Sequence, residues 1–228
     1  MTSLKGIQAC VFDAYGTLFD VHSAVAQHSA RLVDAAAVST LWRTKQLQYT
    51  WLRTLMGRYV EFWQVTGDAL DFALETHQVS DSPLREDLMQ AYLELSCYPE
   101  VPLALKALCQ RGIRCAILSN GSPAMLAAAV ENAELVDRFS AVISVDPIQI
   151  YKPDPRVYQM AVDELKLAPA QIAFQSSNAW DAVGAAAFGF QVVWVNRFGQ
   201  QPERLGVQGA AELNSLEGLP GLLGLLGD

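Results

Sequence analysis

Short runs of apolar residues recur along the chain, and helical patterns separate the later ones. The runs typical of buried strands are 7–12, 114–118, 141–145, 172–175 and 191–195. Strands that alternate with helices are typical of a parallel sheet with helices on both of its faces. The pattern therefore predicts an α/β fold with a doubly wound parallel sheet.

A long helical pattern stands between the first and second of these apolar runs. It extends from about residue 21 to residue 99, which is far too long for a simple crossover between parallel strands. We therefore expect residues 21–99 to form an inserted helical cap domain. Residues 1–20 and 100–228 are then expected to form the core domain.

The predicted cap has more large apolar side chains than one helix stripe accommodates. They are Leu41, Trp42, Leu47, Tyr49, Trp51, Leu52, Leu55, Met56, Tyr59, Phe62 and Trp63. The surplus needs a second partner, which is either the core domain or a second copy of the chain. These residues fit either partner, and we expect a homodimer. At the other end of the chain, the Leu- and Gly-rich tail 216–224 predicts a frayed helix.

The composition narrows the classes of partner. The net charge of −8 over 228 residues disfavours binding to nucleic acid, which needs a basic surface. No apolar stretch reaches the roughly 20 residues of a membrane helix, and the N-terminus does not have the pattern of a cleavable signal. We expect a soluble cytoplasmic protein that acts on a small molecule. An anionic substrate then needs local cations to capture it.

The cysteines show neither a C-x-x-C pair nor a spacing with histidine that suits zinc. They are Cys10, Cys97, Cys109 and Cys115. This usage is typical of buried thiols in a cytosolic protein.

The first apolar run ends at Asp13 and enters a Gly-Thr turn. Ligands of parallel α/β sheets bind at the carboxyl ends of the strands, so Asp13 is a candidate nucleophile, although Asp also commonly caps turns. Many strand-end aspartates that accept phosphoryl groups have a second Asp two residues later. Here Tyr15 stands at that position. The sequence therefore predicts chemistry other than ordinary phosphate hydrolysis.

Polar residues also follow the second and third runs. Ser119 and Asn120 end the second run and are candidate ligand contacts. Lys152 follows the third run, and Pro153 keeps it out of the helical conformation. A lone Lys is usually solvated, but at this edge of the sheet it is placed to hold Asp13 ionised and to pair with a substrate carboxylate.

The fourth run ends in Gln-Ser-Ser-Asn-Ala-Trp-Asp, residues 175–181. This segment places two hydroxyls, an amide, an indole and a carboxylate at the same edge of the sheet. A helix cap would explain Asp181 alone, but it leaves the rest of the cluster unexplained.

In order and spacing, Asp13, Ser119, Lys152 and Asp181 resemble the four motifs of the haloacid dehalogenase superfamily, and the resemblance extends from residue 13 to residue 196. Three segments are more specific and are similar to the L-2-haloacid dehalogenase branch: Asp-Ala-Tyr-Gly-Thr at 13–17, the stretch 41–53, and Ser-Ser-Asn-Ala-Trp-Asp at 176–181. The resemblance implies a Rossmannoid core with a helical cap. It also implies a hydrolase of carbon–halide bonds that converts (S)-2-haloacids to (R)-2-hydroxyacids and halide. Haloacetates, including fluoroacetate, are further candidate substrates.

The resemblance implies a reaction in two steps. Asp13 attacks the α-carbon with inversion and forms an aspartyl ester, while Arg43 receives the departing halide from the cap. Water then attacks the ester carbonyl, activated or oriented by Asp181, and restores the enzyme.

The resemblance also implies how the substrate is held. Ser119 binds the substrate carboxylate, Lys152 adds positive charge, and Asn120 assists Arg43 at the halide. The two carboxylates are held by Thr17, Ser176 and Asn178, and Tyr158 supports Lys152. An apolar wall is formed by Tyr15, Leu47, Phe62 and Trp180. The edge of Trp180 also faces the halide.

The need for a metal ion distinguishes the predicted dehalogenase from a phosphatase of the same superfamily. Phosphatases of the superfamily hold Mg²⁺ with acidic residues in the first and fourth motifs, because this hard cation prefers carboxylate oxygens. Tyr15 replaces one such acid, and Asp181 is the single carboxylate of the fourth motif. We therefore expect no metal and no other cofactor.

Three other functions were weighed. A superfamily phosphatase or phosphonatase stays as the alternative enzyme. A binding module without catalysis is disfavoured, since the reactive positions are all present. A Ser-His-Asp hydrolase is set aside, because the chain has no G-x-S-x-G motif and no His at a later strand end.

Overall fold

The computed structural model describes residues 4–207 and 211–224 of the chain. In these residues a sheet of six strands has the order β3-β2-β1-β4-β5-β6, and each neighbouring pair is parallel. The strands are β1 (Ala9–Phe12), β2 (Arg114–Ser119), β3 (Ala141–Ser144), β4 (Ile172–Ser176), β5 (Gln191–Val195) and β6 (Ala211–Leu213). The first five confirm the predicted strands, and β6 is an additional edge strand that the apolar pattern did not predict.

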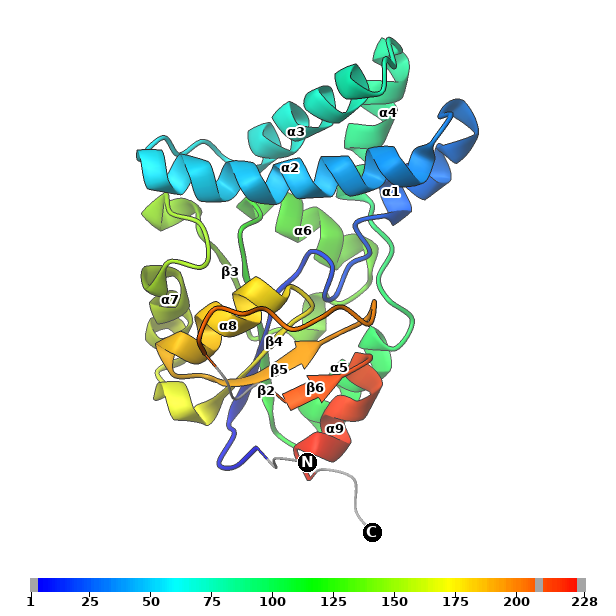
Figure 1. Cartoon of the computed structure of the whole chain (residues 1–228). Coiled ribbons are helices and arrows are strands. Elements are labelled where there is room, and N and C mark those ends of the chain that lie inside the picture. Colours follow the sequence, from blue (N-terminus) through cyan, green and yellow to red (C-terminus); the bar gives the residue numbers. More distant parts are fainter. Residues whose placement is uncertain (1–3, 208–210, 225–228) are drawn as a thin grey trace.

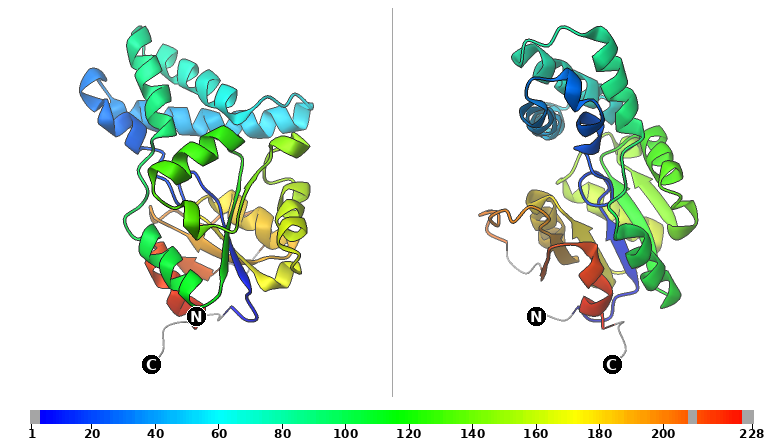
Figure 2. Two further views of the ribbon diagram at one scale, coloured as in Figure 1. Left: turned by 180° about the vertical axis from the view of Figure 1, so that it is seen from behind. Right: turned by 90° about the vertical axis from the view of Figure 1, so that its right-hand side faces the viewer.

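Helices cover both faces of this sheet. They are α5 (Val101–Gln110), α6 (Pro123–Asn132), α7 (Pro155–Leu165), α8 (Ala179–Phe188) and α9 (Leu219–Leu222). In Figure 1, α8 lies in front of the strands, whereas α5 and α6 face the viewer in the reverse view of Figure 2. The predicted doubly wound α/β fold is confirmed.

The helices α1–α4 lie between β1 and β2 in the chain, and we call them the cap. They are α1 (Ser23–Gln27), α2 (Ala35–Met56), α3 (Phe62–Thr76) and α4 (Ser82–Leu93). The predicted helical content of this stretch is confirmed. In Figure 1, α2 crosses the molecule above the carboxyl ends of the strands, with α3 and α4 stacked on its far side. The cap therefore covers the edge of the sheet where the strand-end side chains meet.

Short 3₁₀ turns complete the connections. They are Ser29–Arg31, Val136–Arg138, Asp146–Ile148, Pro169–Gln171 and Leu216–Gly218. The last of these turns and α9 pack against α5, and both Leu216 and Leu219 are fully buried. The prediction of a frayed helix for the tail is therefore wrong for these residues, because leucine side chains anchor the segment to the core.

Helix α2 has clear signals at both ends. The Asp34 carboxylate accepts a hydrogen bond of 2.9 Å from the backbone N–H of Ala37, as an N-cap should. Gly57 ends the helix in the left-handed region with φ of 63°. Trp42 and Gln46, one turn apart, are buried on the side that packs against α3.

The surplus apolar residues of the cap range from buried to exposed, and most of them are partly buried. Trp42 and Phe62 are buried, whereas Leu55 and Met56 near the end of α2 are 83% and 63% exposed. Packing against the rest of the chain therefore accounts for only part of the surplus.

The cysteine prediction is partly wrong. Cys10 and Cys115 are buried on neighbouring strands, but Cys97, which precedes α5, and Cys109, in the last turn of α5, are only partly buried.

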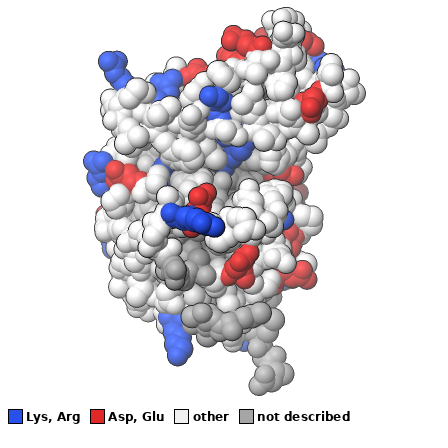
Figure 3. All heavy atoms as spheres, in the orientation of Figure 1, with Lys and Arg blue, Asp and Glu red and all other residues white. Residues whose placement is uncertain are grey.

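None of the helices in the described ranges is long and apolar enough to span a membrane. Figure 3 shows acidic and basic side chains dispersed over one face of the molecule, without a broad basic area among the atoms it colours on that face.

Candidate active site

Asp13 lies directly after β1, at the centre of the sheet. Its backbone N–H donates to the carbonyl of Gln175, so the residue is still held by β4. The chain then turns at Gly16, whose φ of +90° favours glycine, and Thr17 returns toward the strand end. The Thr17 hydroxyl lies 3.2 Å from Asp13 Oδ2. This turn leaves the Asp13 carboxylate 6% exposed and points it toward the cap.

Lys152 connects Asp13 to a second buried carboxylate. Its ammonium nitrogen lies 3.0 Å from Asp13 Oδ1 and 2.9 Å from Asp181 Oδ2, and also packs over the Phe174 ring. Burial by itself lowers the pKa of Lys152, but the charges of the two carboxylates outweigh it and raise that pKa above its usual value. The ammonium therefore stays charged.

Asp181 is the more deeply placed of the two carboxylates, and it is fully buried in α8. Its Oδ1 accepts a hydrogen bond of 2.8 Å from the Tyr158 hydroxyl. Burial raises the pKa of Asp181 above its usual value, although Lys152 opposes that rise. A carboxylate with a raised pKa is a better proton acceptor, which suits a general base.

The segment between β4 and α8 supplies further contacts to Asp13. Asn178 donates from its side-chain amide to Asp13 Oδ2 over 2.9 Å. Ser176 contacts the Asn178 backbone N–H rather than Asp13, at 3.2 Å. The Ser177 N–H donates to Thr17 Oγ1 over 2.8 Å, so this loop fixes the hydroxyl that contacts Asp13.

Hydrogen bonds also join the end of β2 to the loop after β3. Asn120 accepts a hydrogen bond of 3.0 Å from the Lys152 backbone N–H, which fixes the chain at Lys152. Ser119 is fully buried, and its hydroxyl accepts from the Gly121 N–H at 3.1 Å. The four strand ends therefore meet around Asp13.

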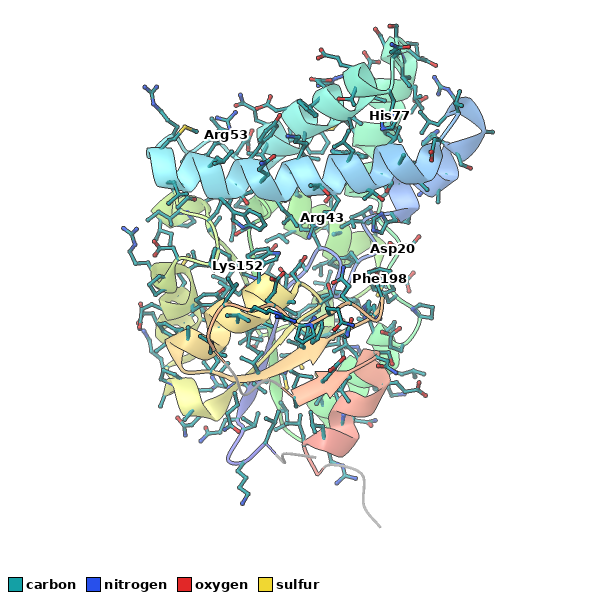
Figure 4. The ribbon with its side chains drawn as sticks, viewed as in Figure 1. Asp20, Arg43, Arg53, His77, Lys152 and Phe198 are labelled. Atoms are coloured by element: carbon teal, nitrogen blue, oxygen red, sulfur yellow. The ribbon has the colours of Figure 1, made fainter. Side chains whose placement is uncertain are left out.

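Arg43 extends from the middle of α2 toward this group, and Figure 4 shows it below α2 while Lys152 lies above α8. Its guanidinium donates to the Tyr15 carbonyl at 3.0 Å and to Gln46 Oε1 at 2.7 Å, with Asn178 Oδ1 at 3.4 Å. Among residues 4–207 and 211–224, no carboxylate forms an ion pair with Arg43. The guanidinium therefore keeps its positive charge available.

A small pocket with a volume of about 10 Å³ lies between Arg43 and Asp13. Its lining residues are Asp13, Tyr15, Arg43, Leu47, Phe62, Ser119, Asn120, Lys152, Asn178 and Trp180. Every one of them is among the residues that the sequence predicted for the site. The other predicted residues lie behind this lining: Thr17, Tyr158, Ser176 and Asp181.

Wider grooves flank the pocket on either side. One shares Arg43, Leu47 and Asn178 with the pocket and has a volume of about 350 Å³. The other shares Lys152 and Trp180 with it and has a volume of about 660 Å³. The pocket itself is much smaller than either groove, which favours a small ligand.

Three residues that contact the site were not predicted from the sequence. Gln46 contacts Arg43, Tyr92 stacks on Tyr15 with ring centroids 5.6 Å apart, and Ser177 holds Thr17. Gln46 stands three residues after Arg43 on the same helix, and this spacing was the signal that could have found it. Tyr92 comes from α4, and no local pattern relates it to Tyr15.

The arrangement suits displacement of an anionic leaving group. It sets the Asp13 carboxylate, which contacts the Lys152 ammonium, across a small pocket from an arginine that no carboxylate of the described residues neutralises. The hydroxyl of Tyr15 and the indole N–H of Trp180 are buried and have no hydrogen-bond partner in the described chain. Both residues line the pocket, so these donors are available to a bound ligand.

Comparisons with known proteins agree with this geometry. A family model for haloacid dehalogenase-like hydrolases matches residues 7–189. (S)-2-haloacid dehalogenase 1 of Pseudomonas sp. (strain CBS-3) is 50% identical over 219 residues, which cover 95% of this chain and 96% of that protein. Haloacetate dehalogenase H-2 of Moraxella sp. (strain B) is 43% identical over 208 residues, which cover 89% of this chain and 92% of that protein.

Solved structures give the same result. The L-2-haloacid dehalogenase from Xanthobacter autotrophicus with chloropropionic acid covalently bound superimposes with a TM-score of 0.89 and 39% identity, over 95% of this chain and 98% of that one.

Proposed function

Because the chain belongs to the haloacid dehalogenase-like hydrolases, we propose that it hydrolyses (S)-2-haloacids to (R)-2-hydroxyacids and halide. The observation that carries the proposal is that Asp13 and Arg43 line the same small pocket. The nearly full-length relatives that act on 2-haloacids support it, and the relative that acts on haloacetate makes haloacetates a second class of substrate.

The first step forms an ester between Asp13 and the substrate. An oxygen of the Asp13 carboxylate attacks the α-carbon from the side opposite the halogen, a carbon–oxygen bond forms, and the halide leaves with its electron pair. Inversion at the α-carbon follows from this attack. Arg43 stabilises the halide, together with Asn120 and Trp180, which line the same pocket.

The second step hydrolyses that ester. Water attacks the carboxyl carbon of Asp13 while Asp181 takes one of its protons. The ester carbon–oxygen bond then breaks, and the departing alkoxide takes that proton back from Asp181 and leaves as the hydroxyacid. The second water proton is released to solvent, and Asp13 is again a carboxylate, with one oxygen from the water. Lys152 lies within hydrogen-bond distance of both carboxylates, so its charge stabilises the negative charge that develops on the ester carbonyl.

Other residues hold the reacting groups in place. Ser119 binds the substrate carboxylate at the end of β2, with positive charge from Lys152 nearby. Thr17 and Asn178 orient Asp13, while Tyr158 orients Asp181 and so supports Lys152. Ser176 acts through the backbone of Asn178. Tyr15, Leu47, Phe62 and Trp180 form the apolar wall that keeps water from competing with the substrate.

The reaction needs no metal ion and no other cofactor. Within the part of the chain that the structure describes, no group of three or more His, Cys, Asp or Glu side chains is placed to hold a metal ion. The positive charge that the two carboxylates need comes from Lys152, 3.0 Å from Asp13 and 2.9 Å from Asp181.

The test is halide release from each enantiomer of 2-chloropropionate in the presence of EDTA. We expect chloride from the (S) enantiomer, with (R)-lactate as the product, and no turnover by Asp13→Ala. A parallel assay follows phosphate release from a generic phosphate ester with Mg²⁺. Phosphate release without chloride release would instead support the phosphatase alternative.

We also propose that residues 21–99 form a separate cap domain and that the protein is a cytoplasmic homodimer. The exposed apolar end of α2, with Leu52, Leu55 and Met56, supports the dimer. The free thiols of the described cysteines support a reducing compartment.

A further inference from the structure

Arg43 differs from the other paired arginines of this protein in the kind of group that holds it. Arg31, Arg53, Arg85, Arg156 and Arg197 each form an ion pair with Asp or Glu. The shortest hydrogen bond of Arg43 is instead the 2.7 Å contact from Nη1 to the amide oxygen of Gln46. A carboxylate would bind a guanidinium more strongly, but it would also neutralise the charge.

The orientation of the Gln46 amide is fixed by a chain of buried hydrogen bonds. The hydroxyl of Thr66 donates to the backbone carbonyl of Phe62 over 2.7 Å, so its oxygen is free to accept. The Gln46 Nε2 amide donates to that oxygen over 2.8 Å. The amide oxygen must therefore face the other way, toward Arg43.

The network is closed to solvent. Gln46 is 1% exposed, Thr66 is fully buried, and Tyr92 is 3% exposed. The Tyr92 hydroxyl donates to the same Gln46 oxygen over 3.1 Å. Each member of the network therefore has a defined donor or acceptor role.

We propose that Gln46, fixed by Thr66, is a positioning residue that aims Arg43 at the departing halide and leaves its positive charge unneutralised. The inference rests on the proposed role of Arg43 as the halide acceptor. It assigns the cap a second function besides covering the site, because the anchor Thr66 belongs to α3 and Gln46 to α2.

The test compares kcat/KM for (S)-2-chloropropionate with kcat/KM for (S)-2-bromopropionate. Chloride is a poorer leaving group than bromide and carries a more concentrated charge, so its departure depends more on stabilisation by Arg43. Gln46→Met removes the hydrogen bond at similar volume, and we expect kcat/KM for the chloro substrate to fall about tenfold or more. The chloro-to-bromo ratio should fall with it.

Gln46→Glu separates orientation from charge. It keeps an oxygen against Arg43 but introduces a carboxylate that neutralises the guanidinium. We expect a Tm close to that of the parent protein, together with a fall in the chloro-to-bromo ratio. Bromide should also become a weaker product inhibitor.

Controls come from the same network. Tyr92→Phe removes a second hydrogen bond to the same Gln46 oxygen. Because the Tyr92 hydroxyl also interacts with Arg43, this variant should lower the chloro-to-bromo ratio less than Gln46→Met does. Thr66→Val should lower the chloro-to-bromo ratio because the Gln46 amide loses its hydrogen-bond acceptor. Thr66→Ser keeps a hydroxyl at this position and should give the ratio of the parent protein.

Two outcomes overturn different claims. If Arg43→Met lowers the chloro-to-bromo ratio but Gln46→Met and Gln46→Glu do not, Gln46 has no positioning role. If Arg43→Met itself leaves the ratio unchanged, Arg43 is not the halide acceptor, and the proposed function fails at that residue.

Discussion

Lys152 is the residue on which the electrostatics of the site depend most. It is 1% exposed and contacts two carboxylates that are themselves almost fully buried. Removing one member of a buried charge group usually costs more than the whole group contributes, since the remaining charges are left without a partner. A cation at this position therefore stabilises the folded protein and, in the mechanism we propose, the reaction.

We expect Lys152→Met to lower the free energy of unfolding by about 3–5 kcal/mol and to abolish measurable halide release. Asp13 and Asp181 would then lie close together without a counter-charge, and Asp13 would lose the cation that orients it. Urea unfolding at pH 7 and chloride release measure the two effects. Unchanged stability would show that water already shields these carboxylates.

The pKa of Lys152 also predicts a pH dependence. That pKa is raised in the folded state, so the folded protein binds this proton more tightly than the unfolded chain, whose lysine titrates at about 10.4. The stability that Lys152 provides is present below that pH and is lost as the pH rises through the higher folded value.

The difference in unfolding free energy between the parent protein and Lys152→Met should therefore stay constant from about pH 8 to 10 and shrink above about pH 10.4. Urea titrations across this range measure it. A difference that grows with pH would contradict the sign of the shift.

At the scale of elements, the approach of α8 to α7 places Asp181 against its partners. Gly184 makes this approach possible, because a Cβ there would lie 2.5 Å from the Tyr158 hydroxyl and 2.7 Å from Pro153 Cβ. The same Tyr158 hydroxyl donates to Asp181. The small residue thus acts on the site through the spacing of two helices.

Gly184→Ala tests this spacing. Helix propensity alone would make alanine more favourable by about 1 kcal/mol. The contacts with Tyr158 and Pro153 oppose that gain, and we expect a lower Tm and a lower kcat, because Tyr158 must move away from Asp181. Thermal unfolding and steady-state chloride release provide the two measurements.

Ala187→Gly is the matched control in the same helix, at an exposed position. It should cost about 1 kcal/mol of stability and leave kcat unchanged. A higher Tm for Gly184→Ala would show that the gain in helix propensity outweighs the contacts with Tyr158 and Pro153. The spacing of α7 and α8 would then not require glycine at this position.

At the scale of the whole molecule, the cap presents one face of α2 to the site and another to solvent. Leu55 is 83% exposed, and Met56 and Leu52 are 63% and 43% exposed on the same part of the helix. Apolar side chains grouped in this way favour a protein partner. A second copy of the chain is the partner we propose.

Leu55→Asp places a charge in the proposed interface. We expect a shift from dimer to monomer in analytical ultracentrifugation, with little change in the monomer's secondary structure. Leu103→Asp, at a 71% exposed position on α5, serves as the control and should leave the mass unchanged. A parent protein that sediments as a monomer would rule out the dimer.

Much of the fold was predictable because its signals are local. The apolar runs of β1 to β5 are continuous in the chain, and the helical stretch between β1 and β2 is too long to be a simple connection. The edge strand β6 has only three residues, none of them fully buried, so it lacked the apolar run that reveals a strand. Its formation depends on the backbone of β5, which a sequence pattern does not show.

The amino-acid sequence by itself determined where the strands end and which reactive side chains follow them. These side chains are Asp13, Ser119, Lys152 and Asp181, and each comes after a strand that the apolar pattern predicts. The match to known motifs located Arg43. Only the tertiary structure decided how these groups are held. Gln46 meets Thr66 and Tyr92 across three cap helices, and Lys152 was found between two carboxylates rather than beside one. Periodicity along the chain reports which face of an element is buried. The partner that buries it comes from the packing of distant segments, and in this protein that packing sets the direction and charge of the catalytic groups.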